Sequence, residues 1–469
     1  MLIYLLKRLL LFVPTLLVVS LLAFGLSRVA PGDPVLSACA GNRELLPDDY
    51  RRCAGELHLD RPAFYFSLAP ASYPDTLYRI LPLHRRETLR KMIALYGEWP
   101  LLAEYDRELQ KLQEQIRLLP DSIDRQLRID LRQAAESLRL ASQEKAVRGQ
   151  WERLQGLLAG SPQVDGLRAQ LGQLQGVGDR LFEGARPNRR FWPGFHWHGL
   201  DNQYHWWLSN TLRGDFGKSY KDKRPVLTKI GEALRWTVLL NALAIALAFG
   251  LAIPLGVFAA TRPDSRADRS IGLGLFALYS LPRFWVATLL IVFFTTAEYG
   301  AWLDWFPSNG LGELPDGASF FERFWVRAHH LVLPVACLAY ASLAFIARQM
   351  RGSMLEVLGL DYIRTARAAG LPERRVIWRH GFRNALFPII TMIASIFPAA
   401  VAGSVVIEVI FGLPGMGWLM YDAIGAQDWP VVFSVLIFSA LLTMVGILVA
   451  DLLYAWADPR VALQKRKGE

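Results

Sequence analysis

The sequence has few cysteines and lacks the short motifs of common ATPases and hydrolases. Only three of its 469 residues are Cys. It has no Gly-x-x-x-x-Gly-Lys-Ser/Thr loop to hold nucleotide phosphates, so we do not expect this chain to hydrolyse ATP. It also has no Gly-x-Ser-x-Gly and no His-Glu-x-x-His sequence. These absences argue against an enzyme, and we predict no catalytic residue.

The sequence contains long apolar runs, which lie near its start and after residue 237. A bilayer-spanning helix needs about 20 mostly apolar residues. The first run could be a cleaved signal peptide, but no small-x-small cleavage site follows closely, so we expect a retained span. We therefore predict an all-α polytopic membrane protein with six transmembrane helices. They cover Leu9–Leu26, Thr237–Ala260, Ile271–Ala297, Leu331–Ala347, Ala385–Ile407 and Val431–Ala457.

Lys and Arg residues predict the orientation, because short cytoplasmic loops are enriched in them. Basic segments precede the first span, separate spans two and three, separate spans four and five, and follow span six. The alternate loops, 298–328 and 408–430, carry few basic residues. Both termini are then cytoplasmic, and residues 31–230 lie outside, in the periplasm or its equivalent. The net charge of +10 is mostly a topology signal, so we expect no nucleic acid partner.

Two of the cysteines, Cys39 and Cys53, fall in the outer region, where an oxidising compartment permits a disulfide. The alternative, that Cys39 and Cys53 are two unpaired thiols, is equally compatible with the sequence. The aromatic segment 191–207 is typical of a membrane–water interface. It contains three histidines, but no Cys or carboxylate cluster stands at ligand spacing, so we predict no metal site.

The outer region also contains leucines at helical spacing between about residues 64 and 190. Short breakers such as 160–162 divide them into several runs. This pattern predicts a helical hairpin or small bundle. Two interpretations remain open: a docking surface for a partner, or a solvated decoration without chemistry.

Residues 361–370 predict a short helix on a cytoplasmic loop. Asp361 is a suitable N-cap, and Gly370 before a proline is a helix stop. A helix of about nine residues is marginal in water unless something holds it. With small Ala366 and with Arg364 and Arg367 on its surface, it suits a groove on a soluble partner. A lipid-facing helix held by anionic headgroups is the alternative.

Several segments are similar to inner-membrane permeases in the peptide/nickel group of ATP-binding-cassette importers. Their signature cytoplasmic loop resembles residues 347–391, ARQMRGSMLEVLGLDYIRTARAAGLPERRVIWRHGFRNALFPIIT. Other segments that resemble the family are APGDPV (30–35), LRGDFGKSYKDKRPV (212–226), VIEVIFGLPGMGWLMYDAIGAQDWPVV (406–432) and DLLYAWADPR (451–460). Two departures stand out: Ala369 replaces a frequent Lys, and the family's usual Glu-Ala-Ala opening is reduced to Ala366 and Gly370.

The resemblance implies a type I importer permease fold and a coupling helix that sits in a cleft of an ATPase subunit. The implied contact residues are Asp361, Tyr362, Arg364, Thr365, Ala366, Arg367 and Gly370. It also implies partners: a second homologous permease, two ATPase subunits, a periplasmic substrate-binding protein and membrane lipids, in a bacterial inner membrane. This chain would bind no cofactor, and ATP with Mg²⁺ would sit on the partner subunits.

The first outer loop departs most from the family. Its usual Leu-x-Leu-Asp-Arg-Pro and Gln-Tyr-x-x-Trp-Leu segments are present at 57–62 and 203–208, with residues 63–202 between them. We predict a helical insertion at about 64–202. The organisation is then a first span at 1–30, an outer region at 31–230, and a five-helix permease core at 231–469 with a coupling loop at about 348–383.

Two sites along the pathway are predicted on physical grounds. Arg283 follows Pro282 inside span three, and a charge at that depth is expensive. It either attracts a substrate carboxylate or sits in a wet kink made by the proline. A tight turn near the outer face contains Gly412, Pro414, Gly415 and Gly417, either as an outer gate or for packing alone. The rival function is a membrane-anchored sensor or scaffold whose outer helical block binds a partner.

Overall fold

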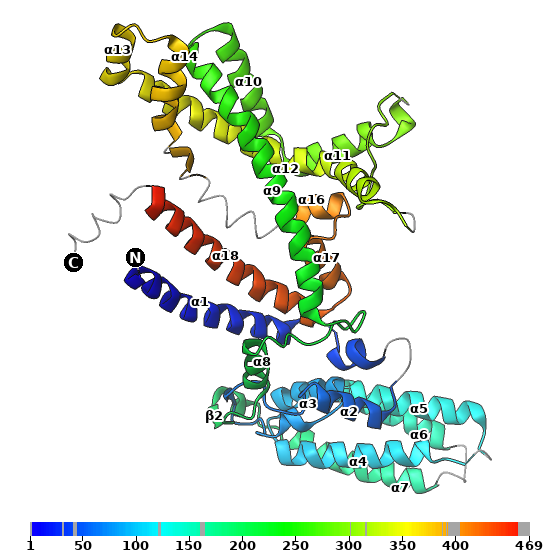
Figure 1. Ribbon diagram of the computed structural model, residues 1–469. Helices are drawn as coiled ribbons and strands as arrows, with labels where there is room; N and C mark the ends of the chain where they lie inside the picture. The colour runs from blue at the N-terminus through cyan, green and yellow to red at the C-terminus, as the bar shows by residue number, and fades with distance from the viewer. Residues whose placement is uncertain are drawn as a thin grey trace. The chain divides into compact units, whose positions relative to one another are not determined.

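The computed structural model describes residues 2–30, 32–40, 45–120, 123–159, 165–300, 302–314, 317–386, 388–390, 392 and 404–457 (Figure 1). The chain divides into two compact units. One consists of residues 1–30 together with 215–469, and the other of residues 31–214. We call them the membrane unit and the bundle unit, and describe each by itself.

The membrane unit contains four described helices that are long and apolar enough to cross a bilayer. They are α1 (Leu2–Val29), α9 (Val226–Thr261), α12 (Phe320–Leu358) and α18 (Trp429–Ala457). Helices α10 (Arg266–Ser280) and α11 (Arg283–Phe294) add a fifth span if the pair, bent by 96°, is counted as one. The predicted span at 385–407 lies largely outside the described residues, so the count of six stays a prediction.

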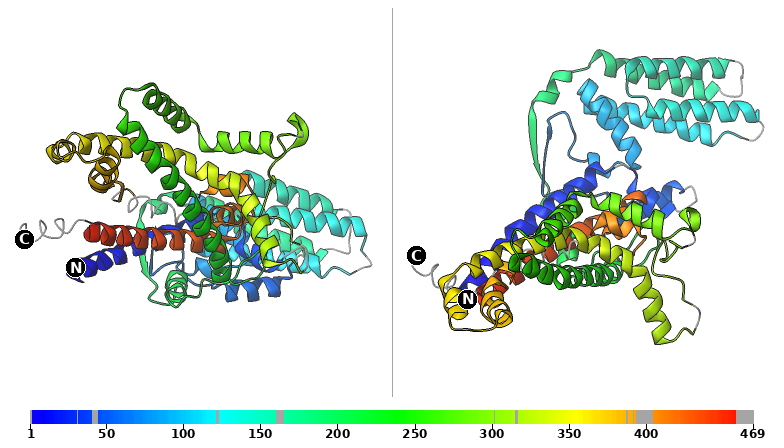
Figure 2. Two further views of the ribbon diagram at one scale, coloured as in Figure 1. Left: turned by 45° about the horizontal axis from the view of Figure 1, so that its top comes forward. Right: turned by 90° about the horizontal axis from the view of Figure 1, so that it is seen from above.

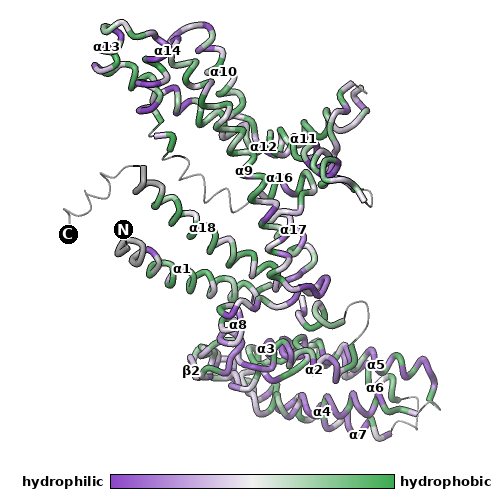
Figure 3. Tube along the Cα trace, in the orientation of Figure 1, coloured by the Kyte–Doolittle hydropathy of each residue, from purple (hydrophilic) through white to green (hydrophobic). Residues whose placement is uncertain are grey.

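Hydropathy separates the two units along the chain. Figure 3 shows α1, α9 and α18 as largely hydrophobic, whereas the helices of the bundle unit alternate between hydrophobic and hydrophilic residues. Apolar residues on all sides of a helix suit lipid, and a single apolar stripe suits a water-exposed bundle. The chain is therefore a multi-pass membrane protein that carries a large polar unit.

Close backbone contact holds α9 against α12. Gly256 on α9 lies at a close approach, since a Cβ atom there would lie 2.7 Å from the carbonyl oxygen of Ala347. Ala248 and Ala252 precede it at intervals of four residues and are buried as well. Small residues at this spacing let two membrane helices approach closely.

The first and last helices of the membrane unit, α1 and α18, lie side by side (Figure 2). Arg8 on α1 forms an ion pair with Asp451 on α18, with Nη2 and Oδ2 2.9 Å apart. Shorter elements complete the unit: α13 (Asp361–Ala368), α14 (Glu373–Arg375), η6 (Val376–Gly381), α16 (Val405–Ile410), α17 (Met416–Gly425) and η5 (Ala297–Tyr299).

Five helices of the bundle unit share one hydrophobic core. They are α3 (Leu83–Tyr96), α4 (Trp99–Arg117), α5 (Arg125–Leu140), α6 (Glu144–Ala159) and α7 (Asp165–Glu183). The leucines at helical spacing supply this core, as Leu112, Leu131 and Leu174 illustrate. The prediction of a small helical bundle is confirmed.

A two-stranded antiparallel sheet, β1 (Phe66–Pro70) with β2 (Pro193–Trp197), joins the two ends of the bundle. Backbone pairing continues past it, because the Gln203 N–H donates to the Pro62 carbonyl at 2.9 Å. The segments 57–62 and 203–208 are thereby brought together. The expected all-α chain did not include this sheet, since its strands are distant in sequence and each is too short to be recognised alone.

The remaining elements of the bundle unit lie before β1, between β1 and α3, or on either side of β2. They are η1 (Leu36–Ala40), α2 (Pro47–Glu56), η2 (Leu77–Arg79), η4 (Pro187–Phe191) and α8 (Gln203–Leu212).

Candidate functional site

Helix α13 lies directly after the long helix α12 and matches the predicted short helix closely. Its N-cap is Leu360, so the assignment of Asp361 as N-cap is wrong by one residue. Asp361 is instead the first helical residue, where a carboxylate is favourable next to the positive end of the helix dipole. At the other end Gly370 has φ +74°, a left-handed conformation that suits glycine after a helix.

Three contacts hold α13 against the rest of the membrane unit. Ile363 is fully buried and is the only buried residue of the helix. The Asn384 side-chain amide donates to the Tyr362 hydroxyl at 2.7 Å. Arg367 forms an ion pair with Glu373 at 2.8 Å, and its hydrogen bonds lower the pKa of the Glu373 carboxyl. A helix this short is stable only with such tertiary support.

The opposite face of α13 is exposed. Arg364, Thr365 and Gly370 are all exposed, whereas Ala366 is half-buried. A Cβ atom at Gly370 would meet nothing within 4 Å. The structure thus brings the seven predicted coupling residues together in one short, anchored segment, and most of them are exposed among the described residues.

Pro282 and Arg283 lie at the break between α10 and α11. Pro282 is the N-cap of α11, and Arg283 is its first residue. The Tyr340 hydroxyl donates to the Leu281 carbonyl at 2.8 Å and satisfies one backbone group freed by the break. Arg283 is exposed, and within the described part of the chain no carboxylate forms an ion pair with it. Arg283 is therefore placed at a bend and not midway along a straight helix.

The glycine-rich turn between α16 and α17 wraps around one carboxylate, that of Glu408. Glu408 is buried. Its Oε2 accepts hydrogen bonds from the Gly417 N–H at 2.6 Å and the Trp418 N–H at 3.1 Å. Its Oε1 accepts from the Thr237 hydroxyl at 2.9 Å. A buried carboxylate with three donors at a helix N-terminus is well stabilised.

Close packing or backbone conformation requires glycine at three positions of this turn. A Cβ atom at Gly415 would lie 2.3 Å from Glu408 Cδ, and one at Gly417 would lie 2.5 Å from the Cα atom of Val405. Gly412 has φ +60°. Pro414 precedes Gly415, and the turn leads directly into α17.

Glu408 and Thr237 are site residues that the sequence analysis did not predict. An acidic residue shortly before a glycine-rich turn was the signal available for Glu408.

A second buried carboxylate, Asp428, holds the segment before α9. Its Oδ1 accepts from the Tyr220 N–H at 2.8 Å, and its Oδ2 accepts from the Ser219 hydroxyl. Nearby, Lys221 and Asp422 form an ion pair at 2.9 Å. The loop 215–225 is thus fixed against the connection between α17 and α18.

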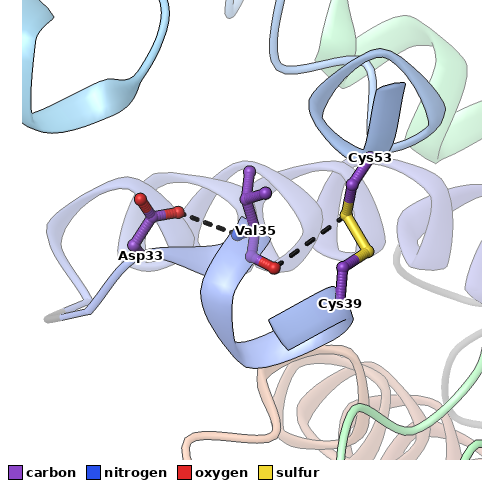
Figure 4. The surroundings of a disulfide bond; sticks show 4 residues. All are labelled: Asp33, Val35, Cys39 and Cys53. Atoms are coloured by element: carbon purple, nitrogen blue, oxygen red, sulfur yellow. Dashed lines mark hydrogen bonds between the residues drawn. A yellow bond between two sulfur atoms is a disulfide. The ribbon is translucent and has the colours of Figure 1, made fainter. Parts of the chain in front are cut away.

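In the bundle unit, Cys39 and Cys53 are joined by a disulfide that ties η1 to α2, with their Cα atoms 6.5 Å apart (Figure 4). Asp33 lies close by and accepts from the Val35 N–H at 2.8 Å and from the Tyr50 hydroxyl at 2.7 Å. Cys337 is a free, buried thiol.

The described residues contain no group of three or more His, Cys, Asp or Glu side chains that could hold a metal ion. The histidines of the aromatic segment have other neighbours. His205 Nδ1 lies 3.1 Å from the Tyr65 hydroxyl, and His198 Nε2 lies 3.1 Å from the Ser67 hydroxyl.

Comparisons with known proteins place these features in a family. Residues 252–463 match the family model described as "Binding-protein-dependent transport system inner membrane component". The match includes the α10–α11 bend, α13 and the turn around Glu408.

Curated relatives extend the match. The chain is 42% identical over 260 residues to "Oligopeptide transport system permease protein AppB" of Bacillus subtilis, covering 55% of this chain and 79% of that protein. It is 36% identical over 269 residues to "Oligopeptide transport system permease protein OppB" of Mycobacterium bovis, covering 56% and 82%. A putative peptide transport system permease protein of Brucella abortus is 40% identical over 256 residues, with 54% and 78% covered. The chain therefore belongs to the family of inner membrane components of binding-protein-dependent transport systems.

Proposed function

We propose that this chain forms one half of the translocation pathway of an ATP-driven importer of peptides or similar small solutes. The relatives above are named as permeases of peptide or oligopeptide transport systems. The alternative of a membrane-anchored sensor or scaffold has no counterpart among those names.

The observation that carries the proposal is the arrangement of α13. It is anchored on one side by Ile363 and exposed on the other, at the end of a long membrane helix. An ATPase subunit that grips the exposed side would move α12 directly, because only Gly359 and Leu360 separate the two helices. ATP binding and hydrolysis, with Mg²⁺, would take place on two such separate subunits. The membrane helices would then alternate between inward- and outward-facing arrangements.

The complete importer would contain a second, similar permease and a substrate-binding protein that delivers the solute. We place it in a bacterial inner membrane with both termini in the cytoplasm, since the basic loops then all lie inside. In this arrangement Arg283 would face the solute pathway beside the bend at Pro282. The turn with Gly412, Pro414, Gly415 and Gly417 would form part of an outer gate.

We also propose that the α3–α7 bundle is an insertion in the first periplasmic loop. The AppB alignment covers 79% of the relative but only 55% of this chain, which accords with a large extra segment. The ends of the segment meet in the β1–β2 sheet. Domains with adjacent termini are tolerated as insertions in exposed loops.

Substitution of Gly370 tests the coupling role. Gly370→Trp places a large side chain on the exposed surface of α13, where it would obstruct a partner. Gly370→Asn is the matched control, because asparagine tolerates a positive φ and is small. In the reconstituted complex, we expect ATP-dependent peptide uptake to fall about tenfold or more with Trp and to persist with Asn. Unchanged uptake by a correctly inserted Gly370→Trp variant would overturn the proposal.

A further inference from the structure

The β1–β2 sheet has one apolar face that is largely exposed among the described residues. Strand residues alternate between two faces, and the register pairs Phe66 with Trp197 and Leu68 with Phe195. These four side chains consequently share one face. Leu68 is 71% exposed, Trp197 66% and Phe195 61%. The other face carries Ser67, Ala69, Gly194 and His196, all partly buried.

Three more large apolar side chains near β2 in sequence are exposed. Phe191 and Trp192 precede β2, Leu200 follows it, and all three are at least 66% exposed. The rings of Phe66 and Phe195 stack with their centroids 5.8 Å apart. Soluble proteins rarely leave so many large apolar side chains together in water, and such a patch marks an interaction surface. A two-stranded sheet is also marginal alone, so its exposed face gains stability when covered.

The sheet is connected along the chain to a membrane span on each side. The bundle α3–α7 lies between β1 and β2, so the sheet is the stem through which the bundle joins the rest of the chain. On one side the stem leads back to α1, which ends at Val29, and on the other it leads through α8 to α9, which begins at Val226. In the proposed topology, the C-terminal end of α1 and the N-terminal end of α9 both lie on the outer side of the bilayer.

The residue types favour lipid as the partner. Trp and Phe are enriched where a membrane meets water, because an aromatic ring tolerates the mixed environment of the headgroups. We propose that the apolar face of the β1–β2 sheet, with Phe66, Leu68, Phe195 and Trp197, lies in the outer leaflet of the bilayer and anchors the stem of the bundle. This inference rests on the proposed orientation, in which residues 31–230 lie outside the cell.

Adjacent residues on the two faces of β1 provide a matched test. Leu68→Cys and Ser67→Cys are made in a Cys337→Ser background, in the full complex, so that the Cys39–Cys53 pair stays in place. Each new thiol is labelled with an environment-sensitive fluorophore, and the complex is placed in nanodiscs containing phospholipids spin-labelled near the headgroup. Trp197→Cys provides a second position on the apolar face.

We expect blue-shifted emission, and quenching about twofold stronger at positions 68 and 197 than at 67. Equal, weak quenching at all three positions would overturn the proposal, because the face would then be in water. A blue shift at 68 without quenching by lipid would also overturn it, in favour of a protein partner. Labelling of Ser67→Cys in intact cells by a membrane-impermeant maleimide tests the orientation separately, so a failure of the proposed topology is recognised as such.

Discussion

Asp268 on α10 and Arg351 on α12 form a two-pronged ion pair. Arg351 Nε lies 2.6 Å from Oδ1 and Nη2 lies 2.7 Å from Oδ2. Asp268 is buried and its Oδ2 also accepts from the Asp264 N–H at 3.1 Å. Arg351 stands ten residues before α13 on the same polypeptide segment. The pair therefore fixes the start of α10 to the part of α12 that leads to the proposed coupling helix.

Loss of this pair should destabilise the membrane unit. Asp268→Asn leaves a guanidinium without its partner, and breaking a fully buried pair costs about 3–5 kcal/mol. Because the Arg351 side chain is 35% exposed, water compensates in part, and we expect about 2 kcal/mol. Thermal unfolding of the purified protein in detergent measures this. Asp264→Asn is the control, since Asp264 is exposed and its φ of +60° suits asparagine. Equal melting temperatures for both variants would contradict the assignment.

The turn around Glu408 should not tolerate a methyl group at Gly415. The added carbon would lie 2.3 Å from the carboxylate carbon, so the carboxylate must move and lose its hydrogen bonds. Overpacking of this kind costs about 1–3 kcal/mol. Gly425→Ala is the matched control, because a Cβ atom there meets nothing within 4 Å and alanine favours the helix. Limited proteolysis at the turn and thermal unfolding should both distinguish the two variants. Identical behaviour would show that the carboxylate does not restrict the turn.

Ile363→Ala should loosen α13 without unfolding the rest of the chain. Ile363 is the single buried residue of the helix, and removing such a side chain costs about 2–5 kcal/mol. A helix of eight residues has little other support, so the loss appears as local opening. Amide hydrogen exchange in residues 359–371 should accelerate, and the assembled importer should transport less peptide for each ATP hydrolysed. Thr365→Ala removes an exposed side chain and should leave exchange unchanged. Unaltered exchange in the Ile363 variant would refute this anchoring role.

The ion pair between Asp222 and Lys229 predicts a pH dependence of stability. Burial raises the pKa of the Asp222 carboxyl, but hydrogen bonds from the Lys229 ammonium and the Arg224 N–H lower it by more, so the pKa is about 2 instead of 3.8. A carboxyl whose pKa is lower in the folded state stabilises above pH 3.8, and this contribution is lost as the pH falls toward 2.

Asp222→Asn removes that titration. Because the Asp222 side chain is 35% exposed, we expect a difference from wild type of only about 1 kcal/mol at pH 5, which disappears near pH 2. Unfolding of both proteins in detergent across this range measures the difference. A constant gap at every pH would contradict the assigned titration.

The disulfide between Cys39 and Cys53 should stabilise the start of the bundle unit. The cysteines are 14 residues apart, and closing a loop of this size contributes about 3 kcal/mol in the chain-entropy account. The double variant Cys39→Ser, Cys53→Ser should unfold at lower temperature and be insensitive to reductant. The wild type should fall to the same temperature when reduced. The non-reduced wild type is alkylated and analysed by mass spectrometry. If both Cys39 and Cys53 carried the alkyl group, the bridge would be ruled out.

Several features of this molecule could be predicted from the sequence because they depend on local pattern. The apolar runs predict α1, α9, α12 and α18, since a span needs only a stretch of suitable length. The leucine spacing predicts the bundle core, and Gly370 predicts the end of α13. Each of these signals is contained within about one helix length of the chain.

Other features depend on residues that are distant in sequence, and only the tertiary structure decided them. Glu408 is held by Thr237, Arg351 by Asp268, and β1 by β2, and neither partner in these pairs predicts the other. A carboxylate in a mostly apolar segment cannot be assigned to the protein interior until its hydrogen-bond donors are known. Burying the carboxylate without such donors would cost too much free energy. The sequence by itself therefore determined where the helices are and which family they resemble. Folding decided which polar groups are buried, because that choice depends on partners that only the folded chain brings within hydrogen-bonding distance.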